Sequence, residues 1–315
     1  MTTASKTAVL LLAHGTPGSP ADVPAYMSNI TGGRPIPDSV MREVQHRYGT
    51  IGQSPLTEIT MQQAESLSRR LGLAVSVGMR NWHPFIADTV KTMRAEGVTR
   101  AAVICLAPQN SRTSVGLYRR ATLSQAEGHI EVTFVDSWHD HPQLITAFSE
   151  KLAQALNMAR LELGRTDVPV IFTAHSVPCR TISGLDRDPY SNEAKRTAAL
   201  VATQCGLQEA DWHFAFQSQG MSGGPWIGPT MEDTIKGLAA SGHSGFVVQP
   251  IGFLCDHVEV LYDVDILFTN FAAQLGLQLW RAESLNDSPL LISALEDLAH
   301  TALSRDASFT SATVR

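Results

Sequence analysis

Short apolar segments alternate along the chain with longer segments that are apolar on one helical face. The short segments span four to six residues, and most are apolar on both faces, which is typical of central strands in a parallel sheet. We predict strands at residues 8–13, 74–78, 101–106, 131–135, 168–173, 212–217, 245–250 and 278–281.

The longer segments between these strands have the spacing of amphipathic helices. We predict helices at residues 57–71, 85–96, 142–163, 191–205 and 230–240. Strands that alternate with helices form right-handed βαβ units, because the crossover connection has a preferred hand. The pattern therefore predicts an α/β protein with parallel sheets.

Two parts of the chain resemble each other. Residues 88–105 read DTVKTMRAEGVTRAAVIC and residues 233–250 read DTIKGLAASGHSGFVVQP, with Asp, Thr, Lys, Ala, Gly and Val at matched positions. AHGTP at 13–17 also matches AHSVP at 174–178, although unrelated βαβ units can converge on similar patterns.

From this repetition we predict two similar Rossmann-like lobes, residues 1–143 and 144–315, with a cleft between them. Each lobe would contain a four-stranded parallel sheet flanked by helices. Whether the C-terminal helix packs back on the first lobe is left open.

Composition narrows the class of protein. The 315 residues include 24 Lys and Arg against 30 Asp and Glu, a net charge of -6 that gives no general attraction for nucleic acid. No apolar run approaches the roughly 18 residues of a membrane span, and MTTASKTAVLLLAHGTP resembles a first buried strand more than a secretory signal. We expect a cytoplasmic protein that does not insert stably into membranes.

The residues that directly follow the strands are the candidates for function, because ligands bind beyond the carboxyl ends of the strands in open α/β sheets. The positions concerned are His14, His175 and residues 108–114, 217–220 and 252–259. Two lobes that face each other would bring these positions together around one cleft.

His175 and Glu259 form a candidate metal site. His175 ends a buried strand, and Glu259 lies with His257 and Asp263 in the segment PIGFLCDHVEVLYDVD. Imidazole and carboxylate together suit Fe²⁺ or Zn²⁺. The same residues could instead be a hydrogen-bonded structural histidine and carboxylates that cap a helix or face solvent.

Motifs in a fixed order resemble the ferrochelatase family. In the second half they are TAHSVP, DPYSNEA, FQSQGMSGGPWIGPT, PIGFLCDHVEVLYDVD and RAESLNDSPL. In the first half they are LLAHGTP, RYGTIGQSPL, VGMRNWHPF and LAPQNSRTSVGLY. The resemblance extends over about residues 8–300, and its specificity comes from nine motifs in order.

This resemblance implies an enzyme, a lyase-type chelatase that inserts Fe²⁺ into a free-base porphyrin in haem biosynthesis. It implies that His175 and Glu259 bind the metal and accept the pyrrole protons, without separating the two roles. Fe²⁺ would be a substrate, no organic cofactor is expected, and we expect a monomer. We also expect desolvation beside an apolar macrocycle to raise the pKa of Glu259.

His14 departs from the family pattern. Short bacterial relatives commonly have Tyr at this position, where it contacts the metal from the opposite porphyrin face. His14 would supply an axial ligand to the iron of the product haem, because imidazole is a good iron ligand. A buried histidine bonded to a neighbouring carbonyl is the structural alternative.

The resemblance also implies porphyrin contacts at Arg47, Tyr48, Ser54, Tyr118 and Trp226. Arg47 and the backbone around Ser54 would hold propionates, and the aromatic rings would face the macrocycle. Ordinary core packing is the alternative for each aromatic side chain.

The motifs indicate the peripheral substituents of the porphyrin substrate less strongly than they indicate the reaction. Residues 31–39 read TGGRPIPDS, a short polar segment that favours coproporphyrin III. Short relatives often carry an Arg pair here, whereas this chain has Thr31, Gly32 and Gly33 before Arg34, so we expect one basic propionate contact to be missing or displaced. RAESLNDSPL resembles protoporphyrin IX enzymes, which leaves protoporphyrin IX as the alternative. The cysteines at 105, 179, 205 and 255 lack cluster spacing, so we expect no iron–sulfur cluster.

Three other functions are alternatives to iron insertion. A dinucleotide-dependent oxidoreductase would show GxGxxG after the first strand, but the chain has HGTPGSPAD there. A two-lobed extracellular solute-binding protein would need an export signal. A cobalt chelatase of tetrapyrrole synthesis is the nearest enzymatic alternative, because His and Glu alone do not separate Fe²⁺ from Co²⁺.

Overall fold

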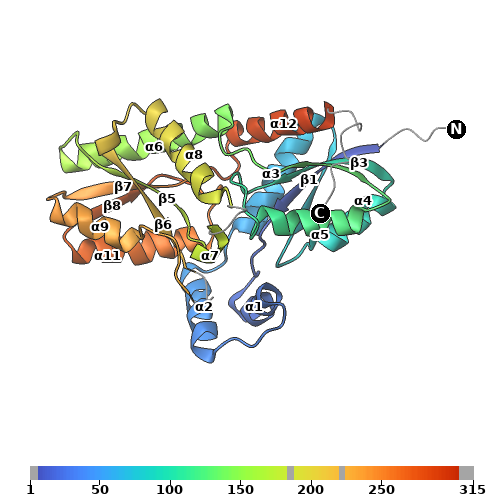
Figure 1. Cartoon of the computed structure of the whole chain (residues 1–315), viewed down its shortest axis with the longest axis horizontal. Helices are drawn as coiled ribbons and strands as arrows, with labels where there is room; N and C mark the ends of the chain where they lie inside the picture. The colour runs from blue at the N-terminus through green and yellow to red at the C-terminus, as the bar shows by residue number, and fades with distance from the viewer. Residues whose placement is uncertain (1–5, 183–187, 220–223, 305–315) are drawn as a thin grey trace.

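Two separate four-stranded parallel sheets form the body of the protein (Figure 1). The computed structural model describes residues 6–182, 188–219 and 224–304, so position 220 of the predicted strand-end set lies outside the described residues. The first sheet has the order β2-β1-β3-β4 and the second the order β6-β5-β7-β8. The predicted fold of two similar α/β lobes is confirmed.

The strands fall close to the predicted segments because each is apolar and largely buried. In the first sheet the strands are β1 Lys6–Ala13, β2 Ala74–Met79, β3 Val98–Cys105 and β4 Glu131–Val135. In the second they are β5 Val170–His175, β6 Trp212–Gln217, β7 Gly245–Pro250 and β8 Gln278–Arg281. Strand β5 runs two residues further than predicted, so His175 is its last residue.

Helices cover both faces of each sheet. The predicted helices correspond to α3 Leu56–Leu71, α4 Ile86–Ala95, α6 Pro142–Leu163, α8 Tyr190–Gln204 and α9 Met231–Ala240. The pattern gave no bounds for α1 Val23–Thr31, α2 Asp38–Ile51, α5 Val115–Ala126, α7 Cys179–Ile182, α10 Val258–Leu261, α11 Thr269–Gln274 and α12 Pro289–Ser304. Short 3₁₀ turns at Pro20–Asp22 and Glu209–Asp211 and a π-helical segment at Asp263–Phe268 complete the described elements.

The internal sequence match corresponds to equivalent elements of the two lobes. Helix α4 begins at Ile86 and α9 at Met231, the same spacing as between Asp88 and Asp233. Each helix leads into the third strand of its own lobe, and these strands, β3 and β7, occupy the same place in the two sheets.

One hydrophobic core extends through both lobes. Leu11 and Ile104 of the first sheet belong to the same buried cluster as Phe172 and Val247 of the second. Helix α12 packs against α6 and also against α3, β3 and β4, so it bridges the lobes at the top of the view in Figure 1. The boundary between residues 143 and 144 stays a prediction.

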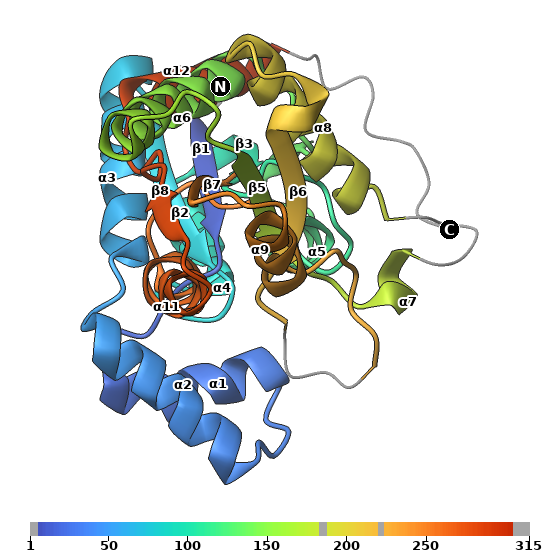
Figure 2. The ribbon, with the colours of Figure 1, turned by 90° about the vertical axis from the view of Figure 1, so that its left-hand side faces the viewer.

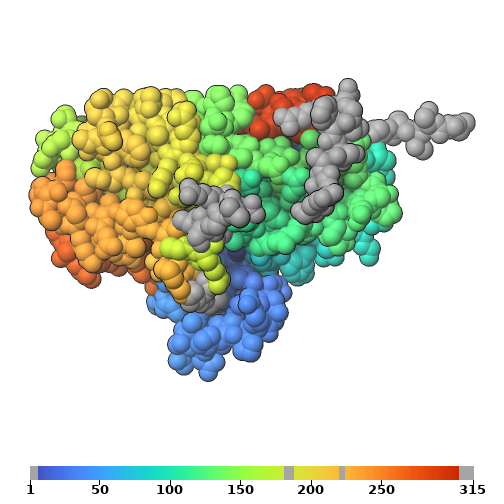
Figure 3. Space-filling view, viewed as in Figure 1, coloured from blue at the N-terminus to red at the C-terminus, as the bar shows by residue number. Residues whose placement is uncertain are grey.

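Helices α1 and α2 project from the body as a separate pair (Figures 2 and 3). Tyr26 and Met27 of α1 pack on Tyr48 of α2 in a small cluster of their own. Trp82 and Val258 pack against this cluster, so the pair is attached to both lobes at its inner side. Within the described residues, no helix is long and apolar enough to cross a membrane.

Two carboxylates of the second lobe hold the loop that follows β3. Asp188, buried just before α8, accepts hydrogen bonds from Ser111 Oγ (3.1 Å) and the backbone N–H of Arg112 (2.9 Å). Glu193 in the first turn of α8 accepts a 2.6 Å hydrogen bond from the backbone N–H of Asn110. These charged acceptors make the bonds stronger than neutral ones, and they tie the two lobes together beside the strand ends.

Candidate active site

A cavity of about 250 Å³ lies between the lobes, at the carboxyl ends of β1, β3, β5 and β7. This is where parallel α/β sheets place their ligands, because the loops that leave neighbouring strands converge there. Its walls are mostly apolar, as in other small-molecule sites. Five of the eight predicted site residues line the cavity: His14, Tyr48, Tyr118, His175 and Glu259.

The carboxylate of Glu259 lies between two imidazole rings. His175 Nε2 is 3.4 Å from Glu259 Oε1, and His257 Nε2 is 3.4 Å from Glu259 Oε2. The side chains of His175 and Glu259 are about one-third exposed, at 31% and 33%, so both can reach a molecule in the cavity. His257 carried no assigned role in the sequence analysis, although its position two residues before Glu259 was the available signal.

Local structure explains how these groups are presented. His175 is the last residue of β5, and its Nδ1 contacts the Ser176 carbonyl oxygen, which leaves Nε2 directed at Glu259. His257 precedes the four-residue helix α10 in an extended conformation. The Gln217 side chain at the end of β6 donates a 2.8 Å hydrogen bond to the carbonyl oxygen of Glu259.

The charges of this group depend on burial and on the neighbouring side chains. Burial favours the neutral carboxyl, but the adjacent His175 and His257 outweigh it and hold the pKa of Glu259 well below its usual value. Burial also opposes the charge on His175, yet Glu259 and the Ser176 carbonyl raise its pKa. The expected rise concerns a carboxylate beside a bound macrocycle and stays a prediction; among the protein groups themselves, the two imidazoles lower the pKa of Glu259.

A second hollow is also lined by Glu259 and His175, and Asp263 is another of its lining residues. The side chain of Asp263 is only 6% exposed; it accepts a hydrogen bond from Ser218 and pairs with Arg47 Nη1 at 2.9 Å. Burial raises the pKa of Asp263, against the opposing effects of Ser218 and Arg47. Arg47, predicted to hold a propionate, lines this hollow and is already paired with Asp263 and Glu43.

The opposite wall of the cavity carries His14. Its side chain is exposed to the cavity; the Asn81 amide nitrogen lies 3.1 Å from Nε2, and the Tyr26 ring centroid lies 6.2 Å from its own. Loss of hydration among the surrounding protein atoms lowers the pKa of His14 to about 4, against the opposing effect of Glu259 and with Arg80 acting in the same direction as the loss of hydration. His14 is therefore a neutral imidazole near pH 7, which is the form that binds metals.

Backbone geometry fixes the turn after His14. Gly15 has φ +85°, a conformation that favours glycine, and a Cβ atom there would lie 2.9 Å from the backbone nitrogen of Trp82. The glycine of the motif LLAHGTP is thus needed for the chain to turn this closely against the loop that follows β2.

The other predicted porphyrin contacts do not all line the cavity. Tyr48 and Tyr118 are almost wholly buried side chains of the cavity wall, and Thr16 Oγ1 donates a 3.2 Å hydrogen bond to Tyr48 Oη. The Trp226 ring lies 6.3 Å from that of His175, but Trp226 is not among the described residues that line the cavity. Ser54 is likewise outside the lining set, and its buried Oγ has no hydrogen-bond partner within the described residues.

Tyr26 and Asn81 were missed by the sequence analysis. Asn81 lies in the quoted motif VGMRNWHPF, which was the only sequence signal for it. Tyr26 lies outside all the motifs and reaches the cavity because α1 packs against the loop after β2. Only the tertiary structure reveals its place beside His14.

The four cysteines are free thiols, and among them Cys255 lines the cavity. Burial raises the pKa of Cys255 to about 12, so it is an uncharged thiol near neutral pH. Over the described ranges 6–182, 188–219 and 224–304, no group of three or more His, Cys, Asp or Glu side chains is arranged to hold a metal ion.

Comparison with solved structures finds the same fold in chelatases. A cobalt complex of the sirohydrochlorin chelatase SirB from Bacillus subtilis subspecies spizizenii has a TM-score of 0.52 at 10% identity, covering 94% of this chain and 95% of that one. CbiX, the terminal enzyme of sirohaem biosynthesis in denitrifying bacteria, has a TM-score of 0.51 at 17% identity, covering 94% and 99%. At these identities the likeness concerns the fold alone.

Relatives identified by sequence are more similar to this chain than these solved structures are. A ferrochelatase of Acidobacterium capsulatum is 53% identical over 312 residues, which cover 95% of each chain. A coproporphyrin III ferrochelatase of Geobacillus thermodenitrificans is 35% identical over 311 residues, covering 95% of this chain and 96% of that one. The family model named Ferrochelatase matches residues 6–303. The chain therefore belongs to the ferrochelatase family, which consists of metal-chelating lyases.

Proposed function

We propose that this protein inserts Fe²⁺ into a free-base porphyrin bound in the cavity between the lobes, with His175 and Glu259 acting on one face of the ring. The observation that carries the proposal is the carboxylate of Glu259 held 3.4 Å from each of two imidazoles on the cavity wall. A carboxylate and an imidazole can bind a divalent iron and can also accept protons, which are the two tasks of the reaction.

The reaction releases two protons. Fe²⁺ forms four bonds to porphyrin nitrogens while two pyrrole N–H bonds break, so the porphyrin binds the iron as a dianion. In this proposal Glu259 and His175 supply two protein ligands, and water and the pyrrole nitrogens complete the coordination of the iron. The lowered pKa of Glu259 favours the carboxylate that binds the cation, whereas the raised pKa of His175 makes metal binding compete with its proton.

His14 would face the iron from the other side of the ring. It lies across the cavity from the Glu259 group, and its low pKa keeps the ring neutral and able to bind iron. Tyr48 and Tyr118 would contact the macrocycle within the cavity, and Trp226 would do so near His175. Arg47 and the backbone around Ser54 would hold propionates, and Arg47 would share its charge between a propionate and Asp263.

Coproporphyrin III is the substrate that we favour. Several relatives at 32–35% identity are named coproporphyrin III ferrochelatases, and the TGGRPIPDS segment between α1 and α2 is exposed and polar. More similar relatives carry the general name ferrochelatase, and RAESLNDSPL favours protoporphyrin IX as the second candidate. A monomer in the cytoplasm, without an organic cofactor or iron–sulfur cluster, stays a prediction from the sequence.

Anaerobic metal insertion tests both the reaction and the substrate. Purified protein mixed with Fe²⁺ should convert coproporphyrin III to its iron complex, seen as the replacement of the four-banded free-base spectrum. We expect a kcat/KM at least tenfold higher for coproporphyrin III than for protoporphyrin IX. The reverse preference would make protoporphyrin IX the substrate, and insertion of Co²⁺ but not Fe²⁺ would assign the protein to the cobalt chelatases.

The His14→Tyr variant should retain iron insertion but change the spectrum of the bound ferric product. A phenolate and an imidazole produce different Soret positions and spin states, and the groups that take the protons lie on the other face. The measurement compares insertion rates and ferric spectra of the wild type, His14→Tyr and His14→Ala. If all three bind product with the same spectrum, His14 is not the axial ligand.

A further inference from the structure

The segment that carries His257, Glu259 and Asp263 has little secondary structure of its own. It runs from residue 254 to residue 265 and contains only the four-residue helix α10 and the start of the π-helical segment. A helix this short is not stable alone, because nucleation costs more than one turn of hydrogen bonds returns. The position of the Glu259 carboxylate therefore depends on contacts from elsewhere in the fold.

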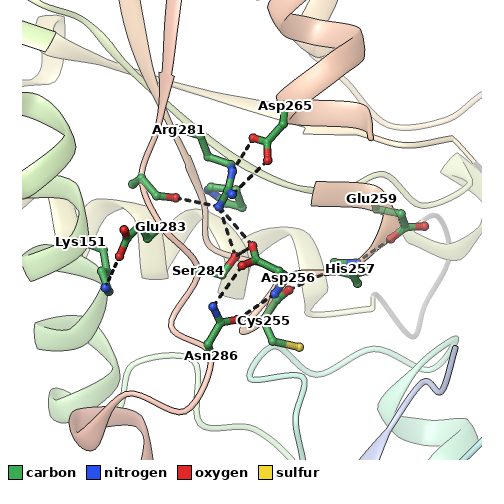
Figure 4. Close-up of polar contacts among 12 residues, drawn as sticks. Lys151, Cys255, Asp256, His257, Glu259, Asp265, Arg281, Glu283, Ser284 and Asn286 are labelled. Atoms are coloured by element: carbon green, nitrogen blue, oxygen red, sulfur yellow. Dashed lines mark hydrogen bonds and ion pairs between the residues drawn. The ribbon is translucent and has the colours of Figure 1, made fainter. Parts of the chain in front are cut away.

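Arg281, the last residue of β8, contacts both ends of this segment (Figure 4). Its Nε and Nη2 donate to the two carboxylate oxygens of Asp265, at 2.5 and 3.1 Å, and Nη1 lies 3.3 Å from Asp256 Oδ1. The Arg281 side chain is only 16% exposed, so water screens these pairs less than ordinary surface pairs. One guanidinium thus joins a residue before Glu259 to a residue after it.

Asn286, in the loop between β8 and α12, holds the beginning of the segment. Its backbone N–H donates to the Leu254 carbonyl (2.8 Å), its Oδ1 accepts from the Asp256 N–H (3.0 Å), and its Nδ2 donates to Asp256 Oδ2 (3.1 Å). Ser284 Oγ donates to Asp256 Oδ1 at 2.8 Å. Asn286 has φ +49°, a conformation that Asn tolerates better than most residues and that directs these groups toward Asp256.

The same residue links the segment to the first lobe. Gln63 of α3 donates a 2.6 Å hydrogen bond to the Asn286 carbonyl oxygen, and Gln63 itself lines the cavity. The contacts of Arg281, Ser284 and Asn286, which we name the C-terminal clamp, thus connect the Glu259 segment with the opposite wall. These residues lie in the motif RAESLNDSPL, to which the proposed reaction assigns no role.

We propose that Arg281 and Asn286 are positioning residues for metal insertion: they hold residues 254–265 so that the Glu259 carboxylate stays between His257 and His175. This inference rests on the proposed function of Glu259. Supporting residues around a metal-binding group commonly alter its performance by about 10- to 100-fold, although they touch neither metal nor substrate. The clamp should therefore affect turnover more than porphyrin binding.

The test measures Zn²⁺ insertion into coproporphyrin III together with porphyrin binding by fluorescence quenching. Arg281→Met removes the charge and the fork of donors, and Asn286→Gly removes the side-chain bonds while permitting the left-handed backbone. We expect each change to lower kcat at least tenfold and to leave the porphyrin Kd within about twofold of the wild type. Arg281→Lys, which can reach one carboxylate, should give an intermediate kcat.

Lys151→Met is the matched control. Lys151 pairs with Glu283 at 2.6 Å beside the clamp, but this pair does not touch residues 254–265 (Figure 4). Its loss should leave both kcat and Kd within about twofold of the wild type. A general effect of removing a cation near β8 would lower kcat in Arg281→Met and Lys151→Met alike.

Several results would overturn the inference. The inference fails if kcat in Arg281→Met and Asn286→Gly is no lower than in Lys151→Met. It also fails if porphyrin binding by these two variants weakens in parallel with their kcat. If Arg281→Met does not fold, Asn286→Gly alone decides. If the wild type is active, Glu259→Gln is inactive and the clamp variants are fully active, only the role of the clamp is refuted. If the wild type itself is inactive, the proposed function is refuted, and with it the inference that rests on it.

Discussion

Glu259→Gln is expected to lower the rate of metal insertion by about 10²- to 10⁴-fold while porphyrin binding persists. The amide preserves the shape of the side chain but removes the negative charge that His175 and His257 stabilise. It can neither accept a proton nor offer a charged oxygen to Fe²⁺. Anaerobic insertion rates and porphyrin fluorescence quenching, measured on the same protein, separate chemistry from binding.

Glu162→Gln provides the control for this substitution. Glu162 is an exposed carboxylate of α6 that accepts hydrogen bonds from Gln278 and from Trp280 Nε1 (3.0 Å), and it does not line the cavity. Its replacement should leave insertion unchanged. If Glu259→Gln turns over at the wild-type rate, Glu259 is neither the proton acceptor nor a required metal ligand.

His175→Ala is expected to reduce insertion below about one hundredth of the wild-type rate while the fold is retained. The change removes one predicted iron ligand and the cation that pairs with Glu259. The backbone carbonyl of residue 175 would still accept the 3.0 Å hydrogen bond from Tyr190 Oη, so this contact at the end of β5 persists. Thermal unfolding should shift by no more than about 4 °C.

His213→Ala is the comparison for the loss of a histidine. His213 lies on the neighbouring strand β6, at an exposed position away from the cavity. Circular dichroism and insertion assays on both variants distinguish two explanations. Loss of folding in His175→Ala alone would show that His175 is a structural residue, and near-normal activity would exclude its role in metal binding.

The two largest predicted effects arise from one group of side chains, His175 and Glu259. The C-terminal clamp implies that the position of this group depends on residues outside it. His175 is placed by a strand of the sheet, whereas Glu259 depends on a segment that Arg281 and Asn286 secure from the other side. Activity is therefore expected to be sensitive to changes near the C-terminal end of the chain. By contrast, Lys151→Met, which breaks the Lys151–Glu283 pair, should leave activity unchanged.

The fold was predictable because its signal is local. Strands such as Trp212–Gln217 and Gly245–Pro250 match their predicted bounds, since an apolar segment with breaks on both sides has few alternatives inside a parallel sheet. The position of His175 at a strand end followed from the same pattern, and the place of that end beside a cleft followed from α/β topology. Helices α1 and α2 were not predicted; their apolar side chains pack mainly on each other in a small cluster of their own.

The sequence by itself therefore determined the two similar lobes and, through motifs, the family and the residues expected to act. The tertiary structure decided which groups meet: Glu259 with His257, Arg47 with Asp263, and Arg281 with Asp256 across about 25 residues of chain. It also decided the charge of Glu259, because a pKa is the sum of burial and of every neighbouring charge. Such sums depend on distances between residues far apart in the chain, which hydrophobic pattern and spacing do not contain.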